Sequence, residues 1–256
     1  MEPCRSADVV TDLTTVGLVA KIVSVHSRKG GVGKTTIAYE RAWLLGGVLV
    51  DLEWDDGGAT RAWGYNHEDR VSAQMVEALE RGRTPRPIVG HRKPALVPGH
   101  PTLGMLDIAA EDVSKALRSW ANDWDAEWIV VDTHPGSNPW SDGANAVADL
   151  VLAPVPLKTK ELEAIAGMVK EMADYPLVLV PNMIPPFPPA GGLARLTSIV
   201  EGTPVRVGPP IPRAEAIGNR RKRMAITAED TPAKALQPVA EAMKDLANYV
   251  RSYRQQ

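Results

Sequence analysis

The amino-acid sequence predicts an α/β fold, with a single doubly wound, mostly parallel sheet flanked by helices. Short runs of Val, Ile and Leu alternate with longer helical patterns along most of the chain. Such runs are typical of strands that are buried on both faces of a parallel sheet and joined by helical crossovers. A glycine-rich loop connects the first run to the first helical segment, and no long linker interrupts the alternation.

The chain has 256 residues, of which 44% are hydrophobic, and this size suits one domain with a sizeable core. We expect an N-terminal extension over residues 1–20 and one domain over residues 21–256. The segments predicted to be strands are 22–27, 48–52, 102–109, 128–132, 149–154, 176–180 and 204–207. The segments predicted to be helices are 35–45, 71–81, 111–122, 160–173, 193–201 and 232–254, and the proline-containing segment 82–101 is predicted to be a loop.

The bulk properties exclude several classes of protein. A net charge of −2 argues against a globally basic nucleic-acid binder, so any such binding must come from a local patch. Cys4 is the single cysteine, which excludes an internal disulfide and a cysteine-rich metal site within one chain. The sequence has neither the pattern of a signal peptide nor an apolar run long enough to cross a membrane. We therefore expect a soluble, cytoplasmic protein.

A candidate phosphate-binding loop lies between the first predicted strand and the first predicted helix. Residues 28–36 read Arg-Lys-Gly-Gly-Val-Gly-Lys-Thr-Thr. Glycines let the backbone wrap tightly, so that successive N–H groups point at phosphate oxygens, and the helix adds its positive N-terminal end. Lys34 supplies a charge for the β- and γ-phosphates, and the Thr35 hydroxyl is a ligand for Mg²⁺. The residues predicted to bind nucleotide here are Lys29, Gly30, Gly31, Val32, Gly33, Lys34, Thr35 and Thr36.

The loop departs from the commonest form of this motif, which has glycine at the position of Arg28. With Lys29 before the paired glycines, it resembles the signature loop (deviant Walker A) of the ParA/MinD family of P-loop ATPases. The resemblance is strongest to the ParA branch and covers about residues 21–230. It implies ATP and Mg²⁺ as cofactors and an ATP-sandwich homodimer in which Lys29 reaches the partner's phosphates. Lys29 and Lys34 would then both stabilise charge in the transition state, as an arginine finger does.

An acidic segment follows the second predicted strand, which ends in Asp51-Leu52-Glu53. Ligands gather at the carboxyl ends of parallel strands. The resemblance makes Asp51 a catalytic and Mg²⁺-binding residue, and it makes Glu53 the catalytic residue that orients the attacking water. The family has aspartate at the position of Glu53, whose side chain is one methylene longer. Asp55 or Asp56 is an alternative for this role if the loop bends differently.

A second acidic position ends the apolar run over residues 128–131. Asp132 follows this run and precedes Thr-His-Pro-Gly, in a pattern that resembles the second Mg²⁺-side motif of the family. Asp132 would hold the metal through water, because Mg²⁺ keeps much of its hydration shell. The family has proline at the position of His134. Two interpretations of His134 remain open, contact with the γ-phosphate or a filling role in the loop.

The candidate base pocket follows the predicted strand at 176–180. The chain reads Pro-Asn-Met-Ile at residues 181–184 and lacks the aspartate with which GTP-specific relatives read guanine. Asn182 can pair with an adenine edge through its amide, which favours ATP. Pro212 lies in a segment that resembles the late loop bordering the base, and it is the other predicted contact.

Residues 213–223, called the basic segment below, carry five basic residues and a single acidic one, Glu215. Contacts with phosphates are independent of base sequence and weaken with salt. The resemblance implies that this segment binds nonspecific DNA when the ATP dimer has formed. The predicted DNA contacts are Arg213, Arg220, Arg221, Lys222 and Arg223.

The resemblance as a whole implies a nucleoid-associated ATPase that partitions plasmid or chromosomal DNA or positions another cargo. A ParB-like protein or another adaptor would stimulate its hydrolysis of ATP. One alternative is a MinD-like membrane-positioning ATPase, which requires a strongly amphipathic C-terminal helix. The end of the chain, residues 246–254, is only mildly amphipathic and contains neither Phe nor Trp, so we expect no membrane association. The other alternative is a small-molecule P-loop enzyme of the same superfamily.

Overall fold

The computed structural model describes residues 20–55, 58–66, 74–189 and 191–254. The strands are β1 (Lys21–Val25), β2 (Val48–Asp51), β3 (Ala95–Val97), β4 (Trp128–Asp132), β5 (Leu150–Val155), β6 (Leu177–Pro181) and β7 (Arg206–Val207). The helices are α1 (Lys34–Leu45), α2 (Ala59–Trp63), α3 (Gln74–Glu80), α4 (Ala110–Asp123), α5 (Pro139–Val147), α6 (Thr159–Glu171), α7 (Gly192–Val200) and α8 (Gln237–Ser252).

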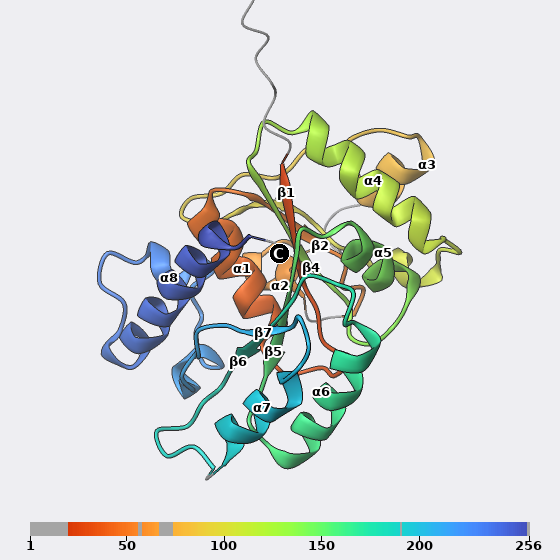
Figure 1. Cartoon of the computed structure of the whole chain (residues 1–256). Coiled ribbons are helices and arrows are strands. Elements are labelled where there is room, and N and C mark those ends of the chain that lie inside the picture. Colours follow the sequence, from red (N-terminus) through yellow and green to blue (C-terminus); the bar gives the residue numbers. More distant parts are fainter. Residues whose placement is uncertain (1–19, 56–57, 67–73, 190, 255–256) are drawn as a thin grey trace, which may run out of the picture.

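The strands form one seven-stranded sheet in the order β3-β2-β4-β1-β5-β6-β7. Every pairing between neighbouring strands is parallel, and helices cover both faces of the sheet (Figure 1). On one side of β1 the strands follow in chain order, β5, β6 and β7, and on the other side lie β4, β2 and β3, so the chain extends the sheet on both sides of β1, as in doubly wound folds. The predicted fold class is confirmed, and the sheet is parallel throughout.

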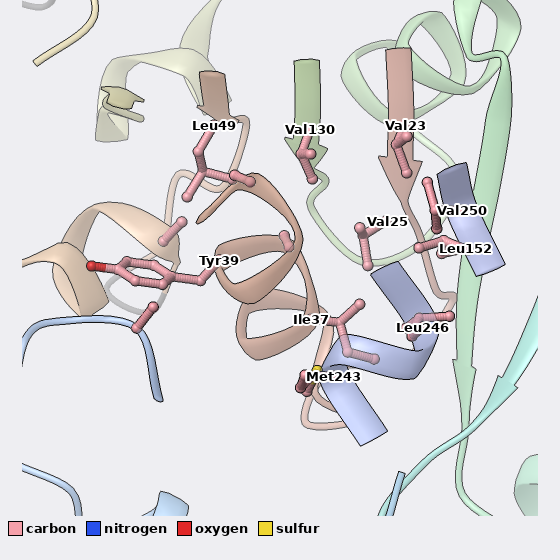
Figure 2. Packing of buried hydrophobic residues seen from close by; sticks show 14 of the residues in the cluster. Val23, Val25, Ile37, Tyr39, Leu49, Val130, Leu152, Met243, Leu246 and Val250 are labelled. Atoms are coloured by element: carbon pink, nitrogen blue, oxygen red, sulfur yellow. The ribbon is translucent and has the colours of Figure 1, made fainter. Parts of the chain in front are cut away.

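The helices α1 and α8 pack together on one face of the sheet. Figure 2 shows Ile37 of α1 and Leu246 and Val250 of α8 beside Val25 of β1 and Leu152 of β5. Each of these side chains is almost completely buried, and full burial of such a side chain stabilises the fold by about 1.5–3 kcal/mol. This packing holds the N-terminal end of α1 at the carboxyl ends of the strands.

Two further hydrophobic clusters lie on the opposite face. Helices α3, α4 and α5 cover β1, β2 and β4, and helices α6 and α7 cover β5 and β6. Successive residues of a strand point to opposite faces, so strands buried on both sides read as continuous apolar runs. This burial explains why the runs predicted the central strands well.

One strand prediction is wrong. Residues 102–109 are not a strand, and β3 lies instead within residues 82–101, which were predicted to be a loop. β3 has three residues and its strand partner is β2, so Pro94 and Pro98 lie outside the paired residues. A short edge strand tolerates prolines at its ends.

The backbone after β3 turns into a 3₁₀ helix, η2 (Pro101–Met105). Pro101 stands in its first turn, and the Nδ1 atom of His100 accepts a hydrogen bond from the N–H of Thr102. Proline fits this position because its φ angle is already close to the helical value. Residues 101–105 therefore form a helical turn, although the apolar residues of 102–109 had predicted an extended strand.

The helices predicted at 35–45, 111–122, 160–173, 193–201 and 232–254 are confirmed within a few residues. The helix predicted at 71–81 is seen as α3, and residues 71–73 lie outside the described residues, as does most of the predicted extension at 1–20. Helices α2 and α5 were not predicted. Asn138 caps α5 by accepting the N–H of Ser141, and Pro139 follows it at the first helical position, a start signal that the sequence carried.

No helix in the described ranges is long and apolar enough to cross a membrane.

Candidate nucleotide-binding site

The loop between β1 and α1 has the conformation that its glycines predict. Gly31 and Gly33 adopt φ angles of 75° and 93°, which side chains other than glycine rarely adopt. A Cβ atom on Gly33 would also lie 2.4 Å from Nδ2 of Asn182. Glycine is therefore required at position 33 both by the backbone angle and by the close approach of β6.

Lys34 is buried at the start of α1, between the loop and the acidic residues. Burial lowers the pKa of its ammonium group, and the carboxylates of Asp132 and Glu53 act in the opposite direction. The three side chains come from α1, the end of β4 and the segment after β2. The structure thus brings together three residues that the sequence assigned to one site.

Asp132 is the strongest candidate ligand for a cation. It lies at the end of β4, directly beside Asp51 in the parallel pairing of β2 and β4. Both of its carboxylate oxygens are buried, and neither has a hydrogen-bond partner among the described residues. Burial raises the pKa of Asp132 well above its usual value, and the neighbouring Asp51 raises it further, whereas Thr35 and Lys34 lower it. Two buried carboxylate oxygens, with the Thr35 hydroxyl and a second carboxylate close by, fit a bound Mg²⁺ ion.

The carboxylate of Asp51, unlike that of Asp132, already accepts several hydrogen bonds from the protein. Its Oδ2 atom accepts hydrogen bonds of 2.6 Å from both the N–H and the Oγ1 of Thr60, and its Oδ1 atom accepts from the N–H of Glu53. Burial raises its pKa to about 6, and these hydrogen bonds oppose the rise. Asp51 therefore anchors the start of α2 in addition to facing the cation site.

Sequence reasoning missed Thr60. Besides donating to Asp51, its Oγ1 atom accepts a hydrogen bond from the N–H of Gly99, so it joins the segments that follow β2 and β3. A Cβ atom on Gly99 would lie 2.5 Å from the carbonyl oxygen of Glu53. No local pattern marks Thr60, because its partners are distant in the sequence.

Glu53 and His134 form a pair that the sequence did not predict. The Nδ1 atom of His134 contacts the Oε1 atom of Glu53, and both side chains are largely buried. The indole of Trp54 stacks on the imidazole, with 3.6 Å between ring centroids and 11° between planes. Of the two alternatives to Glu53, Asp55 is exposed and its N–H donates to Glu53, and Asp56 lies outside the described residues.

Asn182 is buried at the end of β6, and its Nδ2 atom donates a hydrogen bond of 2.7 Å to the carbonyl oxygen of Val32 in the phosphate loop. It also lines a cavity of about 290 Å³ together with Gly33, Thr36 and Pro212. The structure therefore brings both residues of the predicted base pocket to the phosphate loop.

Lys29 lies at the outer side of the loop. Its side chain is exposed, whereas its carbonyl oxygen accepts a hydrogen bond from the Oγ of Ser27. Its ammonium group makes no hydrogen bond or ion pair with the part of the chain that the structure describes. The two lysines of the loop thus differ, since Lys34 points into the site and Lys29 remains available at the surface.

The basic segment carries less free charge than its composition suggested. Arg220 forms an ion pair of 2.6 Å with Glu229 and donates to the carbonyl oxygens of Lys222 and Met224. The side chain of Arg220 is 13% exposed, and Lys222 also contacts Glu229, at 2.5 Å. Glu229 follows the segment in the sequence and neutralises part of it.

The other three basic residues, like Lys222, are exposed. Arg213 pairs with Glu215 at the surface, and Arg223 donates to the carbonyl oxygen of Arg61. Arg221 is exposed and makes no hydrogen bond or ion pair with any described residue. Arg221 is therefore the most available of the predicted DNA contacts, and Arg220 is the least available.

The parallel sheet and the glycine loop between β1 and α1 define a P-loop protein whose site lies at the carboxyl edge of the sheet. No family model matches the sequence. The chain is 28% identical over 170 residues to the chromosome-partitioning ATPase Soj of Thermus thermophilus, covering 63% of this chain and 65% of Soj. It is 29% identical over 165 residues to the chromosome partitioning protein ParA of Myxococcus xanthus, covering 59% of this chain and 57% of that protein. Each match spans less than two thirds of the relative's length.

Solved structures agree with this assignment at the level of the fold. Apo McdA of Cyanothece superposes with a TM-score of 0.73 at 16% identity, covering 90% of this chain and 99% of McdA. A putative plasmid partition protein of Borrelia burgdorferi, solved with AMPPNP, gives 0.71 at 19% identity over 91% and 100% of the two chains. MinD of Aquifex aeolicus gives 0.68 at 20% identity over 93% and 99%. The chain has the fold of these P-loop proteins, and it is similar in sequence to the two partitioning proteins.

Proposed function

We propose that this chain is a ParA-like, Mg²⁺-dependent ATPase that forms an ATP-sandwich dimer, binds nonspecific DNA and partitions DNA or positions another cargo. The observation that carries the proposal is the difference between the two lysines of the loop. Lys34 is buried near Asp132 and Glu53, whereas Lys29 is exposed at the outer side of the same loop. A buried lysine serves the nucleotide bound by its own chain, and an exposed one is available to the nucleotide of a second copy. The relatives named as partitioning proteins support this proposal.

Each residue of the site has a role in this reaction. The loop amides and Lys34 hold the phosphates, and Thr35 and Asp132, with Asp51 beside them, would hold Mg²⁺. The ion would neutralise charge that develops on the phosphate oxygens. Glu53 orients the attacking water, and Lys29 of the partner subunit adds a second cation at the γ-phosphate.

The hydrogen bond between Asn182 and Val32 supports ATP over GTP. Because Nδ2 of Asn182 donates to the Val32 carbonyl, its amide oxygen remains an acceptor for a base. An oxygen accepts a hydrogen bond from the amino group of adenine, whereas guanine carries an acceptor oxygen at the corresponding ring position. We therefore infer that the pocket beside Pro212 selects adenine.

DNA, and not a membrane, is the surface that we propose for the dimer. The apolar residues of α8, among them Val239, Met243, Leu246 and Val250, are buried in the core, so they are not available to insert into lipid. The basic segment carries exposed charges at Arg213, Arg221 and Lys222, and an ATP dimer would present two such segments, which makes binding bivalent. The location that follows is the cytoplasm, in association with the nucleoid, with a ParB-like or other adaptor as the stimulating partner.

The test is a titration of fluorescently labelled duplex DNA with protein at several salt concentrations, in ATP, ADP and no nucleotide. We expect strong binding only with ATP, and an affinity that falls with salt at a slope of about −0.9 per phosphate contact. Replacing Arg221 and Lys222 with alanine should weaken binding to all DNA sequences alike and flatten this slope.

The matched control removes the same charge elsewhere, at the exposed residues Arg81 and Arg86, and should bind as the wild type does. Arg220 is left unchanged because its ion pair with Glu229 is part of the fold. Equal affinity of the Arg221 and Lys222 variant and the wild type would locate the DNA surface elsewhere. A wild type that ignores DNA in every nucleotide state but binds anionic vesicles would favour the MinD-like alternative.

A further inference from the structure

A cluster of three metal-binding side chains lies beside the proposed Mg²⁺ site without being part of it. One ligand atom each of Glu53, Asp55 and His134 lies within 4.8 Å of the other two. The Mg²⁺ ligands proposed above come from α1 and from the ends of β2 and β4, whereas these three residues lie in the loops that follow β2 and β4. The cluster therefore joins the loops that follow β2 and β4.

The cluster is held in place from several directions. Trp54 stacks on the imidazole of His134 and sets the plane of the ring, and the Oγ of Ser141 donates to the His134 carbonyl oxygen. The N–H of Glu53 donates a hydrogen bond to the Asp51 carboxylate, and the N–H of Asp55 donates one to the Glu53 carboxylate. Ligands that are already oriented lose little entropy when they bind an ion.

The chemistry of the cluster differs from that of a Mg²⁺ site. Two carboxylate oxygens and one imidazole nitrogen are ligands typical of Zn²⁺ and related transition-metal ions, whereas Mg²⁺ prefers oxygen alone. With ligand bonds of about 2.1 Å, the ligand atoms of a bound ion lie roughly 3–4 Å apart, and the three ligand atoms here lie within 4.8 Å of one another. A cavity of about 10 Å³, lined by Glu53 and Asp55 among others, has room for one water as a further ligand.

We propose that Glu53, Asp55 and His134 form a binding site for a divalent transition-metal ion. Without the ion, the imidazole contacts the Glu53 carboxylate and keeps two of the ligand atoms together. The ion takes the place of this contact. A regulatory consequence follows, which rests on the proposed function. An ion bound to Glu53 withdraws the carboxylate that orients the attacking water, and the bound ion therefore inhibits ATP hydrolysis.

The experiment is a calorimetric titration of the nucleotide-free chain with Zn²⁺, in a Cys4→Ser background that removes the thiol as a competing ligand. We expect one ion per chain, and an affinity reduced at least about tenfold by His134→Asn and by Asp55→Asn. His91→Asn removes an exposed histidine outside the cluster and should leave the affinity unchanged. Excess Mg²⁺ should not displace the ion.

A second measurement does not depend on these variants. Ni²⁺ should quench the fluorescence of Trp54, since the indole stacks on a proposed ligand, and Trp54→Phe should remove this quenching while Zn²⁺ still binds. Absence of Zn²⁺ binding, or equal binding by His134→Asn and its parent, overturns the proposal. If Zn²⁺ binds through these residues but the chain hydrolyses no ATP, the metal site stands and the proposed ATPase function fails.

Discussion

His26 should make the stability of this protein sensitive to acid. It lies directly after β1, ahead of the phosphate loop, and it is 4% exposed. Burial, together with the smaller effects of the nearby charges of Lys34 and Arg28, lowers its pKa from 6.5 to about 4. Its Nδ1 atom lies 3.2 Å from the Thr133 hydroxyl. The folded state therefore holds a neutral imidazole at a pH where the unfolded chain already binds a proton.

The sign and size of the effect follow from this difference. Above pH 6.5 both states are neutral and the folded state keeps its full stability; as the pH falls from 6.5 to 4, only the unfolded state gains a proton. A difference of one unit in pKa between the folded and unfolded states is equivalent to about 1.4 kcal/mol. The free energy of unfolding should therefore fall by about 3 kcal/mol between pH 6.5 and pH 4. Asp51 acts oppositely, because its raised pKa of about 6 makes the folded state take up a proton first.

A comparison with His26→Gln separates the two effects. Glutamine does not titrate but can still form a hydrogen bond with Thr133, and Asp51 contributes equally to both proteins. Urea unfolding at a series of pH values should show the variant gaining about 3 kcal/mol relative to the wild type between pH 7 and pH 4. Parallel stability curves for the two proteins would refute the reasoning and show that folded His26 takes up protons as readily as an exposed histidine.

Three further predictions concern α1 and its loop. Lys34→Ala should weaken ATP binding about a hundredfold, because a contact with a charged group contributes about 3 kcal/mol, and calorimetry that finds unchanged affinity would contradict this. Lys29→Ala should bind ATP as a monomer but lose the ATP-dependent dimer, and a dimer mass in light scattering would argue against the cross-dimer role. Arg41→Met should raise the melting temperature by several degrees, because the buried guanidinium has no hydrogen-bond partner among the described residues and its pKa is lowered by burial to about 9. Replacing buried charged groups with apolar side chains of similar volume is often stabilising, by about 1–4 kcal/mol, so calorimetry showing a lower melting temperature would mean that Arg41 has an essential partner.

The sequence by itself determined the fold class and the centre of the site, because both depend on local patterns. Strands buried on both faces read as apolar runs, and a glycine loop between such a run and a helix places Lys34 and Thr35 at the helix N-terminus. Asp132 followed from the same rule, since the end of a central parallel strand lies at the ligand edge of the sheet. The sequence did not predict the short edge strand β3, which has prolines on both sides. It also did not lead to a prediction of α5, although Asn138-Pro139 is a helix start signal.

Only the tertiary structure decided which side chains these residues meet. The contacts of Thr60 with Gly99, of Asn182 with Val32 and of Glu53 with His134 join segments that are far apart in the sequence. The same holds for the basic segment, where Glu229 pairs with Arg220 and neutralises a charge that composition alone counted as free. Periodicity and motif spacing describe one stretch of chain at a time, whereas a hydrogen bond or an ion pair depends on where the packing of the core brings two stretches together.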